Sequence, residues 1–142
     1  MTTTQKMMTR TGVLFAATLL ALVVFSGVAL ALTITCTTSL CEGTSSADTL
    51  YERVGDLSSG DETIYGRGGH DDIIATNYEG DNDVLYGGGG VDVLNAQDHS
   101  VGDTLNGGKG FDICYIDRDT ALGAQDATTG CENVRVLSAN YD

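Results

Sequence analysis

The sequence predicts an all-β fold, a parallel β-roll whose ends are held by disulfides. Two observations predict it. Three segments, 64–74, 85–95 and 105–115, align without a gap and begin 20 to 21 residues apart. Each segment also carries large apolar residues in the same phase. Self-similarity at a fixed period is typical of solenoids, in which every repeat packs only on its neighbours.

The N-terminal segment has the features of a targeting sequence. Lys6 and Arg10 precede an apolar run over residues 13–25, and Ala29 and Ala31 then form an A-x-A site. This order is typical of a secretory signal peptide, so we expect cleavage after Ala31 and an exported, extracellular protein. The apolar run extended to Leu32 also has about the length of a membrane anchor, which stays an alternative.

The remaining chain divides by its composition into three parts. We expect an N-terminal cap over residues 32–46, the repeats over 47–116 and a C-terminal cap over 117–142. Without residues 1–31, five basic residues oppose 20 acidic ones, a formal net charge of −15. Such a charge argues against nucleic acid and against anionic membrane surfaces as partners. Bound cations or a solvating coat would both account for it.

Four cysteines follow the predicted signal peptide. An even number in an exported chain indicates disulfides, with three possible connectivities. Closeness in sequence favours Cys36 with Cys41 and Cys114 with Cys131. A four-thiolate metal site is the alternative, although no C-x-x-C spacing occurs.

The three aligned segments contain a strict unit, G-G-x-G-x-D-x-U-x, in which U is a large apolar residue. Arg67 replaces the second glycine of the first unit. The ligand candidates in these units are the aspartates Asp71, Asp92 and Asp112 and the glycines Gly66, Gly68, Gly69, Gly87, Gly88, Gly90, Gly107, Gly108 and Gly110.

Looser acidic units lie between the strict ones, and a weaker one includes Asp48. Steps of nine residues between acidic positions alternate with steps of eleven or twelve, so a coil would stack the strict units along one edge and the loose units along the other. We call these the strict edge and the loose edge. The ligand candidates of the loose edge are Asp61, Glu62, Asp81, Asp83 and Asp103.

The composition of each unit suits a hard cation. Glycines allow positive φ, so that backbone carbonyls turn toward the loop, and the aspartate adds a carboxylate. Calcium takes six to eight such oxygens, so two stacked loops can supply one site. The apolar residues expected to point inward are Ile64, Ile73, Leu85, Leu94 and Leu105, with Cys114 ending the row. Because stacked aspartates repel without a cation, we expect folding and metal binding to be coupled.

With these units the chain resembles the hemolysin-type (RTX) calcium-binding repeat family over residues 43–116. The resemblance implies a right-handed parallel β-roll with Ca²⁺ between consecutive turns of one edge. It implies sites between the turns of Asp71 and Asp92 and between those of Asp92 and Asp112, with about two to five ions in all. Many members are large toxins or enzymes, whereas this chain resembles a small, free-standing bacterial member.

Other classes of function find less support. His70 and His99 belong to no catalytic motif, so we do not expect an enzyme. An adhesive, ice-binding or carbohydrate-binding surface would use outward residues such as Thr63, Tyr65 and Tyr86, and these do not form a regular row. Disorder, favoured by the glycine and acid bias, is the expected state without calcium.

Overall fold

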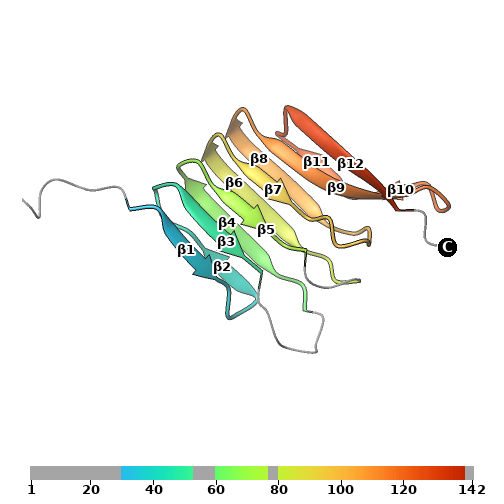
Figure 1. The fold of residues 1–142 in the computed structure, drawn as a ribbon, viewed down its shortest axis with the longest axis horizontal. Helices are drawn as coiled ribbons and strands as arrows, with labels where there is room; N and C mark the ends of the chain where they lie inside the picture. The colour runs from blue at the N-terminus through green and yellow to red at the C-terminus, as the bar shows by residue number, and fades with distance from the viewer. Residues whose placement is uncertain (1–29, 53–59, 77–79, 140–142) are drawn as a thin grey trace, which may run out of the picture.

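A computed structural model describes residues 30–52, 60–76 and 80–139. Within these ranges the chain forms twelve β-strands and no helix, wound into a parallel coil (Figure 1). None of the described residues belongs to a helix of the length and apolarity that crossing a membrane requires. The core of the predicted signal peptide, which is also the alternative membrane anchor, lies outside the described residues.

Two sheets make the walls of the coil, and the chain alternates between them. The five-stranded sheet contains β2 (Leu40–Glu42), β4 (Thr63–Gly68), β6 (Val84–Gly90), β8 (Thr104–Gly110) and β11 (Ala127–Thr129). The seven-stranded sheet contains β1 (Leu32–Thr35), β3 (Asp48–Tyr51), β5 (Asp72–Ile74), β7 (Val93–Asn95), β9 (Ile113–Asp119), β10 (Ala124–Gln125) and β12 (Asn133–Ala139). All pairings are parallel except that of β10 with β9. The predicted all-β parallel roll is therefore confirmed.

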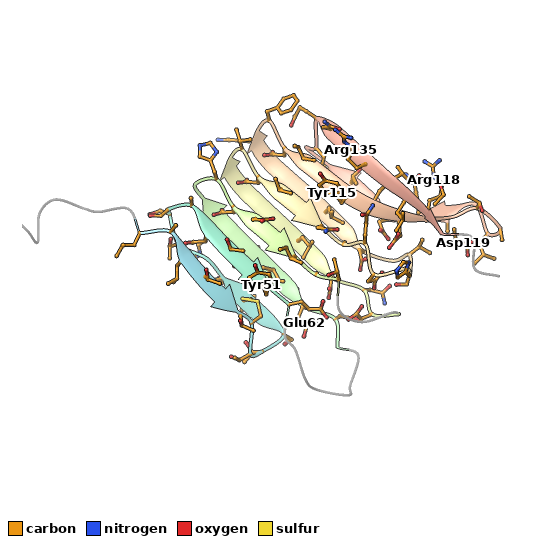
Figure 2. The ribbon with its side chains drawn as sticks, in the orientation of Figure 1. Tyr51, Glu62, Tyr115, Arg118, Asp119 and Arg135 are labelled. Atoms are coloured by element: carbon orange, nitrogen blue, oxygen red, sulfur yellow. A yellow bond between two sulfur atoms is a disulfide. The ribbon has the colours of Figure 1, made fainter. Side chains whose placement is uncertain are left out.

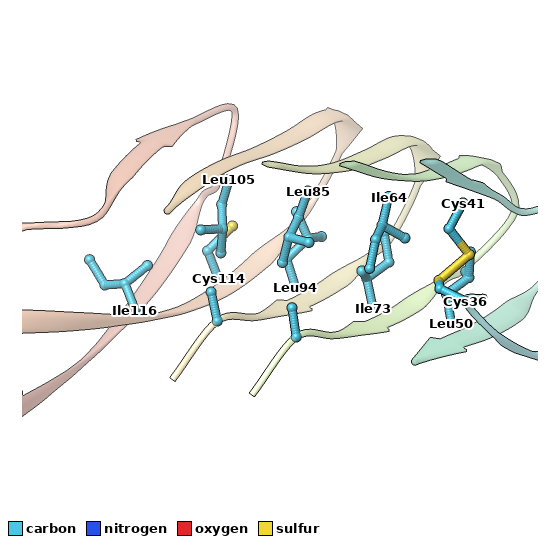
Figure 3. Close-up of a cluster of buried hydrophobic side chains, with 12 residues drawn as sticks. Cys36, Cys41, Leu50, Ile64, Ile73, Leu85, Leu94, Leu105, Cys114 and Ile116 are labelled. Atoms are coloured by element: carbon cyan, nitrogen blue, oxygen red, sulfur yellow. A yellow bond between two sulfur atoms is a disulfide. The ribbon is translucent and has the colours of Figure 1, made fainter. Parts of the chain in front are cut away.

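Equivalent residues of successive turns lie directly beside one another. Ile64 pairs with Leu85, and Leu85 with Leu105, while Ile73 pairs with Leu94, and Leu94 with Cys114. These six side chains, all predicted to point inward, are 0% exposed. Figure 3 shows them as facing pairs between the two sheets. Alternation along each strand turns the intervening side chains outward, so the core is a narrow stack of apolar pairs, one side chain from each sheet.

The two disulfides join the cysteines that sequence proximity favours. Cys36 pairs with Cys41, and Cys114 pairs with Cys131, with Cα–Cα distances of 5.4 and 5.9 Å. The first disulfide is buried at the N-terminal end of the core, and the second joins the core row to the last turn. Both ends of the roll are therefore covalently closed.

The segment predicted to be the C-terminal cap continues the coil. β11 extends the five-stranded sheet beside β8, and β12 extends the seven-stranded sheet beside β9. In β12, Val134 and Val136 lie beside Cys114 and Ile116, in the inward-facing phase. They are 40% and 41% exposed, and no strand among the described residues packs beyond β12.

Close approach between turns explains the glycine at position 87. A β-carbon built there would lie 2.6 Å from both Asp92 Oδ2 and Gly107 O, and backbone cannot yield as a flexible side chain can. Gly89, in the same loop, has open space at the equivalent position.

We expect Gly87→Ala to lower the free energy of unfolding by about 1–3 kcal/mol, because the added methyl group overpacks the loop. Gly89→Ala, the matched control, should leave stability within about 0.5 kcal/mol of the native protein. Chemical denaturation of the disulfide-intact chain measures both. Equal effects of the two substitutions would contradict the loop geometry.

The one departure from the strict pattern carries backbone strain. Arg67 has a φ of 79°, in register with Gly88 and Gly108, whose φ values are 108° and 99°. For a residue with a β-carbon, this left-handed conformation costs roughly 1–2 kcal/mol. The Arg67 guanidinium forms an exposed ion pair with Glu42 at 2.5 Å, and such pairs return only about 0.2–1 kcal/mol.

Arg67→Gly should therefore raise the melting temperature by a few degrees, since relief of strain outweighs the lost ion pair. Arg67→Ala keeps the positive φ and loses the ion pair, so it should melt below the native protein. Thermal unfolding followed by circular dichroism gives the order of the three proteins. Alanine and glycine variants with the same melting temperature would show that the backbone at this position is not strained.

Candidate metal centre

A ladder of carboxylates runs along the strict edge. The backbone N–H of each aspartate donates to the carboxylate of the equivalent residue one turn later. Asp48 donates to Asp71 Oδ1 at 2.9 Å, Asp71 to Asp92 Oδ1 at 2.9 Å and Asp92 to Asp112 Oδ1 at 2.8 Å. The ladder ends outside the predicted repeats, where Asp112 N–H donates to Glu132 Oε2 at 2.8 Å. One oxygen of each carboxylate is thereby fixed by a backbone N–H of the preceding turn.

The second oxygen of these carboxylates lacks such a partner. Oδ2 of Asp71, Asp92 and Asp112 is buried and has no hydrogen-bond partner within the described part of the chain. The three residues are at most 2% exposed. A buried carboxylate oxygen without a donor is unfavourable by several kcal/mol in general, so a ligand for these oxygens is expected.

The first turn fills the same position with protein donors. Asp48 Oδ2 accepts hydrogen bonds from the Thr44 backbone N–H at 2.6 Å and from the Thr44 hydroxyl at 2.7 Å. Burial alone would raise the pKa of Asp48, but these two hydrogen bonds and a third from the Leu32 N–H lower it. The fold therefore supplies donors in the first turn and leaves the next three turns without them.

Backbone carbonyls of the next turn converge on these unpartnered oxygens. Beside Gly87 the two oxygens are Asp92 Oδ2 and Gly107 O, and beside Gly107 they are Asp112 Oδ2 and Gly130 O. The equivalent position at Gly66 brings together Asp71 Oδ2 and Gly87 O. Carboxylate and carbonyl oxygens from two consecutive turns are the donor set that Ca²⁺ takes.

Burial and neighbouring charge both act on the strict-edge carboxyl groups. Burial raises the pKa of Asp71 to about 6, and the charges of Asp92 and Asp48 add to the shift. The pKa of Asp92 is raised as well, first by burial and then by the charge of Asp112. Without a bound cation, the ionised forms of these carboxyl groups are therefore unfavourable in the folded chain.

The loose edge carries a second ladder of the same design. Glu62 N–H donates to Asp83 Oδ1 at 2.7 Å, Asp83 N–H to Asp103 Oδ1 at 2.7 Å and Asp103 N–H to Asp126 Oδ1 at 3.2 Å. All four side chains are at most 3% exposed. The looser glycine pattern of this edge does not weaken the alignment of its carboxylates.

Four carboxyl groups gather at the N-terminal part of the loose edge. Glu52, Glu62, Asp81 and Asp83 are buried and each offers one oxygen within 4.8 Å of the others. Glu62 is labelled at this loop edge in Figure 2. Oδ2 of Asp81 is buried without a hydrogen-bond partner in the described residues. Opposite ligands of Ca²⁺ lie roughly 4.6–5.2 Å apart, twice the metal–oxygen distance, so this quartet has the spread to hold a metal ion.

Burial first, and then repulsion between neighbouring carboxylates, raises the pKa of several groups on the loose edge. Burial raises the pKa of Asp81 to about 6, and the charges of Asp98 and Glu62 add to it. Burial raises the pKa of Asp83 to about 7, with the charges of Asp81, Glu52 and Glu62 contributing. The pKa of Asp103 reaches about 8, by burial and then by the charges of Asp126, Asp98 and Asp83.

The structure groups the predicted ligands into two sets. Asp71, Asp92 and Asp112 line the strict edge, and Glu62, Asp81, Asp83 and Asp103 line the loose edge. Asp61 joins neither set, because it is exposed and its Oδ1 accepts the Asn82 N–H at 2.9 Å. Gly68 lies in register with Gly89, and Gly89 with Lys109, so this is a variable position of the unit.

The sequence analysis missed five acidic residues of the two edges: Glu52, Asp98, Asp117, Asp126 and Glu132. Two of them left a detectable signal. Asp126 and Gly130 repeat the spacing of Asp103 and Gly107, while Gly130 and Glu132 repeat the spacing of Gly110 and Asp112 at the end of a strict unit. Glu52 and Asp98 belong to no repeated spacing. Only the folded coil brings them to the loose edge.

The outer faces of the strands carry a stacked tyrosine pair and an irregular row of polar and apolar side chains. Tyr65 and Tyr86 stack with ring centroids 4.6 Å apart and planes 4° apart, so each covers a face of the other. Thr63, Val84 and Thr104 alternate polar and apolar side chains along the neighbouring row. His70 accepts a hydrogen bond from the Val91 N–H through Nδ1.

Comparison of the chain with protein-family models, with curated protein sequences and with solved structures finds no match. The fold and the two carboxylate edges therefore define the protein as a β-solenoid with a buried acidic cluster able to hold a metal ion.

The raised pKa values predict how stability without metal depends on pH. A carboxyl group with a higher pKa in the folded chain stabilises the fold fully below the unfolded pKa, about 4, and loses this contribution as pH rises through the folded value. For Asp81, Asp83 and Asp103 the losses end near pH 6, 7 and 8. In chelator we expect a higher melting temperature at pH 5 than at pH 8.

Saturating calcium should reverse this order, because binding requires ionised carboxylates and releases protons. Differential scanning calorimetry at the two pH values, with chelator and with calcium, gives the four melting temperatures. A melting temperature in chelator that rises from pH 5 to pH 8 would show that these carboxyl groups are not buried together.

Proposed function

We propose that the protein is an exported calcium-binding repeat protein of the hemolysin-type (RTX) class, which completes its fold by binding Ca²⁺ between stacked turns. The observation that carries this proposal is the row of unpartnered oxygens Asp71 Oδ2, Asp92 Oδ2 and Asp112 Oδ2. Where protein donors are available, at Asp48, the same oxygen takes two hydrogen bonds. The later turns offer converging carbonyls instead, and a cation satisfies both kinds of oxygen.

The donor set favours a hard cation over a transition metal. The residues that would hold ions are Asp71, Asp92 and Asp112 with the carbonyls of Gly87, Gly107 and Gly130 on the strict edge, and Glu52, Glu62, Asp81 and Asp83 on the loose edge. All of these ligand atoms are oxygens, whereas Zn²⁺ and Cu²⁺ sites draw on nitrogen and sulfur. Bound calcium supplies positive charge to both edges.

Export agrees with the two disulfides and the predicted signal peptide. Disulfides persist in oxidising compartments, and exported modules commonly bind calcium near millimolar concentration. A chain that binds calcium near millimolar concentration is loosely structured at the low calcium concentration of the cytoplasm, and it becomes ordered after export. The roll then serves as a calcium-dependent structural module.

A charge-removing isostere on the strict edge should act in opposite directions with and without calcium. In Asp92→Asn, the amide oxygen can still accept the Asp71 N–H, while the unpartnered charged oxygen is lost. We expect the melting temperature in chelator to rise, because repulsion is relieved. We expect calcium to raise the melting temperature of this variant by less than it raises that of the native protein. Isothermal titration should count at least one ion fewer, because Asp92 lies between the turns of Asp71 and Asp112.

Asp72→Asn is the matched control, because Asp72 is an exposed neighbour on β5 and loses the same charge. It should keep the native ion count and calcium response. Absence of calcium binding by the native chain at several millimolar would refute the proposed function. So would an Asp92→Asn protein with the native ion count.

A further inference from the structure

The carboxylate ladder of the strict edge begins at the backbone nitrogen of Leu32. β1 ends the described seven-stranded sheet, and its first residue, Leu32, lies in register with Asp48 (Figure 1). The Leu32 N–H donates to Asp48 Oδ1 at 3.0 Å, just as the Asp48 N–H donates to Asp71 Oδ1. Leu32 therefore holds the ladder position of the first turn, where it supplies a nitrogen and no carboxylate.

The same nitrogen lies at the predicted cleavage site. Ala29 and Ala31 form the A-x-A site, which predicts cleavage of the bond between Ala31 and Leu32. Hydrolysis of this bond by a signal peptidase consumes one water and leaves a carboxylate on Ala31 and a primary α-amine on Leu32. Such an amine is largely protonated at neutral pH. The sequence motif and the hydrogen bond to Asp48 are independent observations, and both single out this one nitrogen.

The surroundings of Asp48 suit an ammonium group. Asp48 is 3% exposed, and the backbone N–H and hydroxyl of Thr44 hold its Oδ2, so that Oδ1 faces Leu32. Among the described residues no lysine or arginine forms an ion pair with Asp48. Charge attraction is stronger at a partly buried carboxylate than in bulk water. A cationic donor at the Leu32 position would therefore stabilise the ionised Asp48 more than a neutral amide does.

Cleavage at this bond leaves the folded part of the chain intact. Leu30 is 72% exposed and Ala31 is exposed as well, so neither contributes to the core. Leu32 and the three residues after it remain paired with β3 in the same register. The new terminus is therefore held beside Asp48 by the strand to which it belongs.

We propose that Asp48, oriented by Thr44, is the binding site for the α-ammonium group of the mature chain, so that removal of the signal peptide stabilises the first turn. Capture of an N-terminal amine is an established mode of recognition. The inference goes beyond the proposed function, because it requires cleavage after Ala31 and requires no calcium. The terminal ammonium supplies to the first turn the positive charge that a bound cation supplies to later turns.

The first residue of the exported protein is the first test. We would express the full chain with its own N-terminal segment in a bacterial host and determine the mass of the secreted product. We expect a chain that begins at Leu32. A different first residue would overturn this inference and leave the proposed calcium binding unaffected.

Acetylation of the α-amine tests the ion pair. Lys6 leaves with the signal peptide, and the exposed Lys109 can be replaced in a Lys109→Arg background, so Leu32 then carries the reactive amine. Acetylation keeps an N–H donor on Leu32 and removes its charge. At several millimolar calcium we expect the melting temperature to fall by roughly 2–6 °C, with the native number of calcium ions by titration.

A chain that begins at Ala31 is the matched control for position. It keeps a terminal charge and moves it one residue away from Asp48, about 3.8 Å along the backbone. Its melting temperature should match that of the acetylated chain. Equal melting temperatures for the free and the acetylated Leu32 chains would overturn the inference.

Asp48→Asn shows whether the effect of acetylation passes through this carboxylate. Acetylation should change the melting temperature of Asp48→Asn by much less than that of the native chain. Asp72→Asn, which removes an exposed charge, should keep the full effect. An undiminished effect in Asp48→Asn would overturn the inference. If Asp48→Asn does not fold, the chains that begin at Leu32, at acetylated Leu32 and at Ala31 decide, because their side chains around Asp48 are native.

Discussion

Parallel stacking in register is the constraint on which the rest of this structure depends. Each residue lies about 4.8 Å from its equivalents in the neighbouring turns. For Ile64, Leu85 and Leu105 this proximity builds a core, because like apolar side chains pack together. For Asp71, Asp92 and Asp112 the same proximity stacks negative charges, which repel by about 3 kcal/mol per neighbouring pair at an effective dielectric near 20. Stacking in register thus stabilises the apolar interior and brings repelling carboxylates together at both edges.

The hydrogen-bond ladders reduce this strain without removing it. Each ladder aspartate receives an N–H from the preceding turn, as Asp92 does from Asp71, and this donor stabilises the ionised form. Burial nevertheless raises the pKa of Asp71 and Asp92. Asp48, with its extra donors from Thr44, has a lowered pKa. These donors contribute to the lowered value, and a divalent cation, if bound, would stabilise the ionised carboxylates of the turns that have no threonine.

The sequence predicts the parts of the fold that repeat with a fixed spacing. The inward row, the strict-edge aspartates and the disulfide partners all follow from positions that recur or lie close in sequence. The quartet at Glu52, Glu62, Asp81 and Asp83 follows only in part, because Glu62 and Asp83 hold recurring positions and Glu52 does not. Asp81 stands two residues before the repeated Asp83, and Glu52 follows a strand whose equivalents, β5 and β7, are followed by Ala75 and Ala96. Such contacts depend on how each loop folds back, which spacing alone does not specify.

Repetition alone allows more than one alignment between turns, and the Cys114–Cys131 disulfide reduces that ambiguity at the C-terminal end. A shift of one residue would turn the core row outward and is excluded by burial. A shift of a whole turn would place Leu85 where Leu105 lies and would cost little in packing, since the side chains are identical. Cys114 occupies one position of the inward row and is joined to Cys131 of the last turn, so only one alignment of the final turns satisfies the bond. The Cys36–Cys41 bond joins residues only five apart and closes the first turn on itself. The Cys114–Cys131 bond is therefore the covalent link that favours the turn-to-turn register in which the carboxylates of each edge come into line.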